Sequence, residues 1–312
     1  MPLSKEENVV CNLCGANDYR VVYPKLRDAS DTPLHEKYSA SKGVLCTDQI
    51  VQCNKCSLVY INPRPTADLI VSACKKGKDE TYVSQEKARL KTFSKELALI
   101  HNNAQKGKLL DIGCAAGYFV KIAQSHGWEV EGIEPNKWLC NYGNKKFGLS
   151  NKAITLEKAK FKIERFDVVT LWDVIEHVPD PIVTLKNVHR VLKPKGHIVL
   201  STPDFDSIFS KMFRRRWWFL LSHHLFYFTP LTIKKMLFKS GFRVIKIKKH
   251  WQYMEIGYMI RMMKNLNKGF FLGSVFDLFE KVLNRVKLNN FMIPYYAGQM
   301  DIVARKTKRK QI

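Results

Sequence analysis

The chain has 312 residues, of which 46% are hydrophobic and 26% are charged. This length accommodates one large α/β domain and a small accessory module, with enough apolar residues for a packed core. The start MPLSKEENVV lacks the apolar segment of a signal peptide, and no apolar run reaches the ~18 residues of a transmembrane helix. We therefore expect a cytoplasmic protein whose eight cysteines bind metal or are buried, rather than forming disulfides.

Positive charge is concentrated at the C-terminal end of the chain. The formal net charge is +24, and residues 206–312 contribute +17 of it, against +1 for 1–80 and +6 for 81–205. A basic surface of this kind attracts anionic molecules. The last third of the chain is therefore expected to face something anionic.

The N-terminal region, 1–65, is predicted to be a small module dominated by turns. Its cysteines occur as two Cys-x-x-Cys pairs separated by 38 residues: Cys11, Cys14, Cys53 and Cys56. Four thiolates satisfy the tetrahedral shell of a structural zinc ion and leave no position for water. Four separate free cysteines are the alternative. Pro63 and Pro65 then interrupt the chain, and Thr66 is a candidate N-cap for a helical linker region over 66–106.

Strands and helices alternate from residue 107 onwards. Strands are predicted at 108–112, 129–133, 166–171 and 197–202, with helices near 117–126, 137–147 and 181–192. A helix from Pro230 to Ser240, a strand from Phe242 and a final strand over 298–306 follow. Alternation of this kind predicts an α/β fold with a doubly wound, mostly parallel sheet, Rossmann-like in form, over 107–312.

A tight turn closes the first of these strands and is the first candidate ligand site. Asp111 ends the strand, Gly113 permits the turn, and Gly117 allows a ligand to approach the start of the next helix. Glu134 follows the second strand about twenty residues later, where a carboxylate can accept both ribose hydroxyls. An ordinary turn and a solvated strand end remain the alternatives, and the full G-x-G-x-x-G pattern is absent.

The segments WDVIEHVPDP, 172–181, and LKPKG, 192–196, complete a recognisable set. In order and spacing, residues 105–250 resemble the class I S-adenosylmethionine-dependent methyltransferases, whose doubly wound sheet has seven strands. The resemblance implies that the loop 111–117, including Cys114, holds the methionine part of the cofactor and that Glu134 and Pro135 flank the ribose. Asn136 and Leu156 would border the adenine, and Asp173 would lie near the amino group. Ala115 replaces the middle glycine of the usual loop, which is tolerable if its φ is negative. A nicotinamide-dependent dehydrogenase would share the loop but not the EHVPDP segment.

The region 206–229 is expected to form a lid over the acceptor. It contains the run RRRWWFLLSHH, in which Trp217 and Trp218 are candidates for stacking on a sugar or aromatic ring. Methyl transfer to a hydroxyl group needs a base, and histidine is the usual one because its pKa is near neutrality. His177, His224 and His223 are the candidates, with His224 and His177 ranked first. For each of them a purely structural role is the alternative.

The predicted acceptor is a hydroxyl group of a sugar or a lipid-linked cell-surface glycan precursor, since bacterial relatives of this pattern often act on such molecules. O-methylation of a small aromatic or quinone-type metabolite is the alternative. Methylation of nucleic acid is less favoured, because the Asn/Asp-Pro-Pro-aromatic segment is absent. A helical insertion is predicted over 254–294, with an apolar stripe that either packs on the domain or contacts an anionic membrane at its inner face. The sequence does not determine the oligomeric state.

Overall fold

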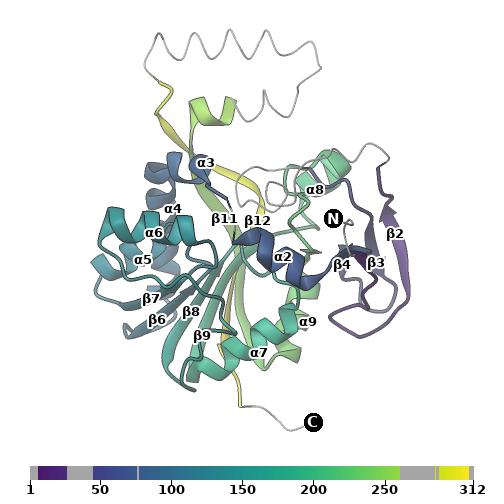
Figure 1. Ribbon diagram of the computed structural model, residues 1–312, viewed down its shortest axis with the longest axis horizontal. Coiled ribbons are helices and arrows are strands. Elements are labelled where there is room, and N and C mark those ends of the chain that lie inside the picture. The colour runs from purple at the N-terminus through teal and green to yellow at the C-terminus, as the bar shows by residue number, and fades with distance from the viewer. Residues whose placement is uncertain (1–5, 27–44, 76, 261–284, 286–287, 309–312) are drawn as a thin grey trace.

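A six-stranded sheet forms the centre of the molecule (Figure 1). The computed structural model describes residues 6–26, 45–75, 77–260, 285 and 288–308. The strand order is β11-β12-β9-β8-β6-β7. Its members are β6 (Lys108–Ile112), β7 (Glu129–Ile133), β8 (Phe166–Trp172), β9 (Leu192–Pro203), β11 (Phe242–Glu255) and β12 (Met292–Lys306). Neighbours among β7, β6, β8 and β9 are parallel, whereas β12 runs antiparallel to both β9 and β11.

The expected doubly wound, mostly parallel sheet is therefore confirmed, with one difference at its edge. The described residues form six strands, not seven. At the place beside β7 where a seventh would lie, there is only an isolated parallel bridge between Ile133 and Lys152. The N–H of Ile154 donates to the Lys152 carbonyl at 2.9 Å, which curls the backbone and ends the pairing after one residue.

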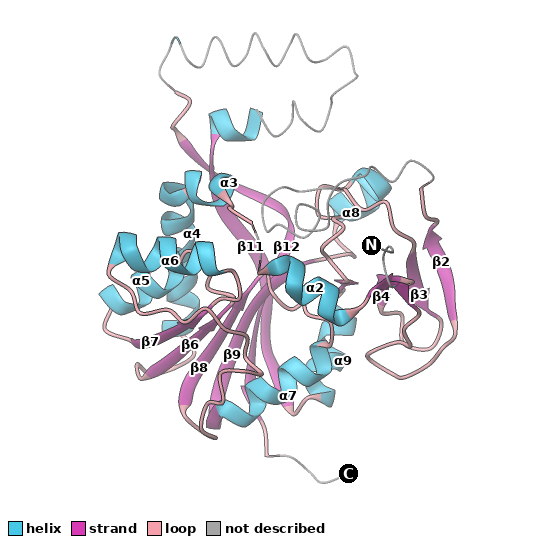
Figure 2. Cartoon of the chain, in the orientation of Figure 1, coloured by secondary structure: helices cyan, strands magenta, loops and turns pink. Residues whose placement is uncertain are grey.

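Helices cover both faces of this sheet, as Figure 2 shows. They include α4 (Glu86–His101) and α5 (Tyr118–Ser125) on one face, and α7 (Pro181–Val191) and α9 (Pro230–Lys239) on the other. Successive strand residues point to opposite faces. Accordingly Leu109, Val168 and Val199 pack with α4 and α5, whereas Leu110, Val169 and Leu200 pack with α7 and α9. Each predicted strand is therefore buried on both sides, which is the usual condition of a parallel sheet.

The N-terminal residues form a second sheet that includes part of the expected lid. The strands β2 (Tyr19–Tyr23), β3 (Ile50–Cys53), β4 (Val59–Ile61) and β10 (Phe226–Tyr227) make a four-stranded antiparallel sheet in the order β10-β4-β3-β2. β1 (Glu6–Glu7) pairs with β5 (Arg64–Pro65) alongside it. Segments about 165 residues apart in sequence, β4 and β10, therefore share one sheet.

The remaining helices are short. They are α2 (Ala67–Cys74), α3 (Glu80–Ser84), α6 (Lys137–Phe147), α8 (Ile208–Phe213) and the 3-10 turn η1 (Arg214–Arg216). Thr66 occupies the N-cap position of α2, as expected, but its side chain makes no capping hydrogen bond. Most of the predicted insertion, 254–294, lies outside the described residues, and the membrane interpretation of its apolar stripe stays a prediction. Within the described part of the chain, no helix is long and apolar enough to span a bilayer.

Candidate active site

A cavity of about 1350 Å³ opens at the carboxyl ends of the parallel strands. Ligands bind at this edge in doubly wound sheets because the loops after each strand converge there. The cavity is lined by residues of α2–α4, the strand ends, the 154–158 loop, the 206–229 segment and the strands β11 and β12, among others. Representative lining residues are Tyr82, Arg89, Gly113, Glu134, Asp173, His177, Trp218, His224, Tyr253 and Tyr295.

The turn after β6 has the left-handed backbone that its glycines predict. Gly113 has φ 68°, and a Cβ there would lie 2.6 Å from Cγ2 of Val174. Ala115 also has a positive φ, 48°. The expectation of a negative φ at this position is therefore wrong, and the methyl group is accommodated at a backbone strain of about 1–2 kcal/mol.

Three residues of this turn are enclosed by protein instead of facing the cavity. A Cβ on Gly117 would lie 2.5 Å from Cδ1 of Leu149, so this glycine permits packing of the loop and not the close approach of a ligand. Cys114 lies in an apolar cluster with Leu149. Asp111 is 1% exposed, and its Oδ1 accepts a hydrogen bond from the Thr170 hydroxyl at 2.7 Å. Burial raises the pKa of Asp111 to about 8.

Glu134 lies at the end of β7, where its carboxylate contacts the turn. Its Oε2 accepts from the Ala115 N–H at 2.9 Å, and its Oε1 accepts from the Asn136 N–H at 2.7 Å. Burial raises the pKa of Glu134 to about 7, while these two N–H groups act in the opposite direction. Each carboxylate oxygen keeps a lone pair for a further donor, because an ionised carboxylate has about four acceptor positions.

The remaining residues assigned to the cofactor also line the cavity. Pro135, Asn136 and Leu156 border it next to Glu134. The Asn136 side chain is engaged as well, since its Oδ1 accepts from the Leu139 N–H and caps α6. Of the nine predicted cofactor residues, six line the cavity and three, Asp111, Cys114 and Gly117, support it from behind.

Asp173 follows β8 and is oriented by two donors. Its Oδ1 accepts from the Ser201 hydroxyl at 2.8 Å and from Gln299 Nε2 at 3.0 Å. Its φ is 52°, an uncommon value for a non-glycine residue and one that is found at functional sites. With Oδ1 occupied, Oδ2 is the oxygen available to a ligand in the cavity.

The three predicted histidines meet in the cavity wall. His177 comes from the loop after β8, and His223 and His224 come from the 206–229 segment. Their ring centroids are 4.8–4.9 Å apart. Burial lowers the pKa of His177, and burial together with the other two rings lowers the pKa of His224 well below its usual value. Both rings are therefore neutral at physiological pH and able to accept a proton.

The two tryptophans of the expected lid differ in environment. Trp217 is fully buried in an apolar cluster with Ile50 and Tyr227, so it packs between the N-terminal sheet and the lid. Trp218 and Arg216 line the cavity. Arg215 instead donates to the Pro24 carbonyl at 2.7 Å. The stacking role stays a prediction for Trp218, whereas Trp217 is enclosed by protein.

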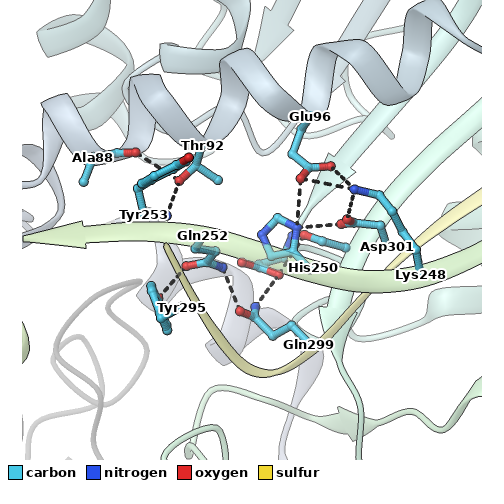
Figure 3. A network of polar contacts seen from close by, with 12 residues as sticks. Ala88, Thr92, Glu96, Lys248, His250, Gln252, Tyr253, Tyr295, Gln299 and Asp301 are labelled. Atoms are coloured by element: carbon cyan, nitrogen blue, oxygen red, sulfur yellow. Dashed lines mark hydrogen bonds and ion pairs between the residues drawn. The ribbon is translucent and has the colours of Figure 1, made fainter. Parts of the chain in front are cut away.

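A buried charged network beside the cavity was not predicted from sequence (Figure 3). The Lys248 ammonium lies 3.0 Å from Asp301 and 3.3 Å from Glu96, and His250 Nδ1 lies 2.6 Å from Asp301. Although burial disfavours the charged ring, these carboxylates raise the pKa of His250 to about 9. Gln299 connects to this region through a 2.7 Å hydrogen bond from Gln252 Nε2. In the sequence, the only indication that polar side chains of β11 point inward was the alternation of residues along this strand.

Aromatic and cationic residues of α3 and α4 were also missed. Arg89 lies over the ring of Tyr82, 3.8 Å from its centroid, and Tyr82 stacks on Tyr118 of α5 at 5.8 Å. Both Tyr82 and Arg89 line the cavity. The region expected to be a helical linker thus forms one wall of the site.

The four cysteines of the two Cys-x-x-Cys pairs converge as predicted. All four Sγ atoms lie within 4.8 Å of one another, with Cys11 and Cys56 3.3 Å apart and Cys14 and Cys53 3.5 Å apart. Tight turns shape the pairs, with the Gly15 N–H donating to the Cys11 carbonyl and the Ser57 N–H to the Cys53 carbonyl. Cys53 ends β3, the other three cysteines lie outside the strands, and none of the four lines the cavity.

Comparison with known proteins identifies the family. A methyltransferase domain model matches residues 82–247, more than half of the chain. The chain belongs to the methyltransferase domain family. The match includes the turn after β6, Glu134, Asp173 and the three histidines, so the residues gathered around the cavity lie almost entirely within the family domain.

Curated relatives match this domain over a limited length. Ubiquinone biosynthesis O-methyltransferase of Coxiella burnetii (strain Dugway 5J108-111) is 29% identical over 120 residues, covering 36% of this chain and 49% of the relative. The enzyme of the same name from Pseudomonas aeruginosa (strain LESB58) is 34% identical over 101 residues, 30% of this chain and 44% of the relative. The chain spans about half the length of the curated relatives it matches.

A solved structure also resembles the chain. A SAM-dependent methyltransferase from Archaeoglobus fulgidus is 21% identical, with a TM-score of 0.49, and the match covers 73% of this chain and 100% of that one.

Proposed function

We propose that this chain transfers a methyl group from S-adenosylmethionine to a hydroxyl oxygen. The observation that carries the proposal is the shared cavity. Glu134 and Gly113 line it at the strand ends, and His177, His223 and His224 line the same cavity. A cofactor held by the first group and an acceptor held by the second would meet in one enclosed space.

The cofactor part of the cavity fits S-adenosylmethionine. The Glu134 carboxylate is buried at the cavity edge with lone pairs left for two ribose hydroxyls, and the second oxygen of Asp173 suits a cationic amino group. S-adenosylmethionine supplies a methyl group on a positively charged sulfonium and becomes S-adenosylhomocysteine. Asn136 and Leu156 would border the adenine, with Pro135 next to the ribose, since all three line the same cavity as Glu134.

The histidine cluster is proposed to promote loss of the acceptor proton. As the new carbon–oxygen bond forms, the hydroxyl proton passes to a neutral ring nitrogen, which later releases it to solvent. The backbone carbonyls of His223 and Phe219 accept from Nδ1 of His177 and His224, at 3.0 and 2.7 Å, and hold these rings with Nε2 available. A base placed in this way typically contributes ~10²–10⁴-fold in rate.

The volume and the lining of the cavity favour a sugar or lipid-linked glycan precursor as the acceptor. Its volume of about 1350 Å³ exceeds the ~300–1,000 Å³ of a typical single-ligand pocket, which leaves room for a large acceptor beside the cofactor. Trp218 and Tyr296 offer ring faces for stacking on a sugar. Ile208 and Met212 of α8, 71% and 61% exposed, lie next to the lining residues Phe209 and Phe213 and would suit a lipid chain at the entrance.

O-methylation of an aromatic or quinone-type metabolite is the second candidate. The names of the curated relatives favour it, and so does the wall of aromatic side chains contributed by Phe219, Tyr258 and Tyr295. A flat ring would stack between such side chains with its hydroxyl group directed at the histidines.

A turnover screen tests the proposal. Release of S-adenosylhomocysteine is measured with nucleotide sugars, lipid-linked sugars, catechols and RNA, for the full chain and for His224→Ala and His177→Ala. At least one hydroxyl acceptor should turn over, and the true base variant should lose ~100-fold or more with cofactor affinity retained. His126→Ala, on the exposed end of α5, is the matched control. Wild-type turnover in both variants would contradict the role of the cluster.

We further propose that the four cysteines hold a structural zinc ion. Four sulfurs within 4.8 Å, arranged by two tight turns, fit a closed tetrahedral site. Purified protein should contain zinc that is lost on Cys53→Ser, together with a lower melting temperature, as elemental analysis and thermal unfolding would show. Zinc-free protein that melts like its Cys53→Ser variant would contradict this assignment.

A further inference from the structure

The geometry of the histidine cluster indicates a role other than that of a single general base. His177, His223 and His224 each offer one ring nitrogen, and these three atoms lie within 4.8 Å of one another. His223 and His224 are both 4% exposed, and all three rings line the cavity. Two buried imidazoles and a half-buried one, at mutual centroid distances of 4.8–4.9 Å, are more than the transfer of one proton requires.

The hydrogen bonds of the cluster fix which nitrogen is available. Nδ1 of His177 lies 3.0 Å from the His223 carbonyl, and Nδ1 of His224 lies 2.7 Å from the Phe219 carbonyl. A carbonyl oxygen can only accept, so Nδ1 carries the proton in both rings and Nε2 keeps its lone pair. A backbone carbonyl on one nitrogen with the other left free is the usual state of a metal-binding histidine.

The neighbouring charged cluster provides a contrast. Glu96, His250 and Asp301 also bring their ligand atoms within 4.8 Å. However, the Lys248 ammonium already lies 3.0 Å from Asp301 and 3.3 Å from Glu96, so a cation occupies that position. At the cavity-lining histidines, in contrast, three ring nitrogens converge with one another.

We infer that His177, His223 and His224 form a binding site for a divalent transition-metal ion, with its remaining coordination positions open to the cavity. Imidazole nitrogen suits zinc and related first-row ions, and three histidines with an open position are a known catalytic arrangement. Nitrogen ligands at ~2.0–2.1 Å from such an ion lie about 3.3 Å apart, so small rotations of the rings would close the site.

This inference rests on the proposed O-methylation and refines it. A hydroxyl group bound at the open position would have a lower pKa, because the ion stabilises the oxygen anion. Its proton would then leave to solvent water, and the three imidazoles would act as ligands instead of one acting as the base. Loss of turnover in His224→Ala is expected in both cases, so activity alone does not separate them and metal content does.

Metal analysis of the full-length protein tests the inference. After incubation with excess Zn²⁺ and removal of free ions, elemental analysis should give about two zinc ions per chain, and about one for the double variant His177→Ala/His224→Ala. The control His126→Ala should keep two. With Co²⁺ as the probe, the double variant should retain the thiolate charge-transfer absorption of the cysteine site and lose only the weaker absorption of a nitrogen-ligated ion.

Each outcome has a defined meaning. One zinc ion per chain in the wild type, or two in the double variant, would overturn the inference. If the double variant melts at a lower temperature than the wild type, His224→Gln provides the same comparison with a smaller change. If the wild type binds one ion but His224→Ala still loses turnover, base catalysis stands and the metal site does not. Two ions without methyl transfer to any hydroxyl acceptor would instead overturn the proposed function and leave the metal site in place.

Discussion

Substitution of Glu134 by glutamine should weaken cofactor binding by about two orders of magnitude. The side chain is 9% exposed and joins the turn after β6 to the start of α6 through hydrogen bonds of 2.9 and 2.7 Å from Ala115 and Asn136. In Glu134→Gln one carboxylate oxygen becomes an NH₂ group that faces a backbone N–H. Hydrogen bonds to a charged group are each worth ~1.5–3 kcal/mol. Weakening two such bonds to the ribose corresponds to about 3 kcal/mol, or roughly 100-fold in affinity.

Isothermal titration calorimetry with S-adenosylmethionine and S-adenosylhomocysteine measures this effect. Glu131→Gln is the matched control, because Glu131 lies on the same strand but pairs with Lys152 and Arg165 away from the cavity lining. Affinity should also rise from pH 6 to pH 8 in the wild type, since the pKa of Glu134 is about 7 and its ionised form accepts the ribose hydroxyls. If folded Glu134→Gln bound within threefold of the wild type, the assignment of this carboxylate to the ribose would be refuted.

Two further predictions concern stability. Gly143→Ala should lower the melting temperature, measured by calorimetry, by several degrees. The added Cβ would lie 2.2 Å from the Ala116 carbonyl oxygen, and overpacking of this kind costs about 1–3 kcal/mol. An unchanged melting temperature would show that the backbone relaxes freely. The pKa of His250 is raised to about 9 by its buried partners Asp301 and Glu96, with Lys248 and Asp173 also nearby, and that of Glu96 is raised to about 7 by burial. Both pKa values exceed those of the unfolded chain, so the free energy of unfolding should fall as pH rises, between about pH 4.5 and 7 for Glu96 and between about pH 6.5 and 9 for His250. The fall between pH 6.5 and 9 should be smaller in His250→Gln. Equal pH slopes for the two proteins would contradict the His250 part.

The sequence is most informative where function and fold impose the same local pattern. The strands β6, β7 and β8 begin and end within one residue of the predicted positions, because each is an apolar run bounded by a turn. Glu134 lies where its position after β7 predicted, since the end of a parallel strand always meets the ligand edge of the sheet. The convergence of the four cysteines also follows from their paired spacing.

Features that depend on distant contacts could not be found in the same way. The positive φ of Ala115 reflects the enclosure of the turn by the rest of the domain, and residue type alone argues against it. The network around Lys248 joins three elements, α4, β11 and β12, and none of their local patterns shows that Glu96 and Asp301 meet. Likewise, nothing local predicts that the segment Phe226–Tyr227 adds a strand to the N-terminal sheet.

That added strand joins the sheet next to the cysteine cluster to the segment that carries His223 and His224. Phe226, two residues after His224, pairs with Tyr60, which lies four residues after Cys56. In addition, the Cys46 N–H donates to the Leu220 carbonyl at 2.7 Å. If the cysteines hold the proposed zinc ion, its removal, like oxidation of the thiols, should also disturb the packing around His223 and His224. We would then expect a change at the cysteines to impair the proposed acceptor site as well as stability.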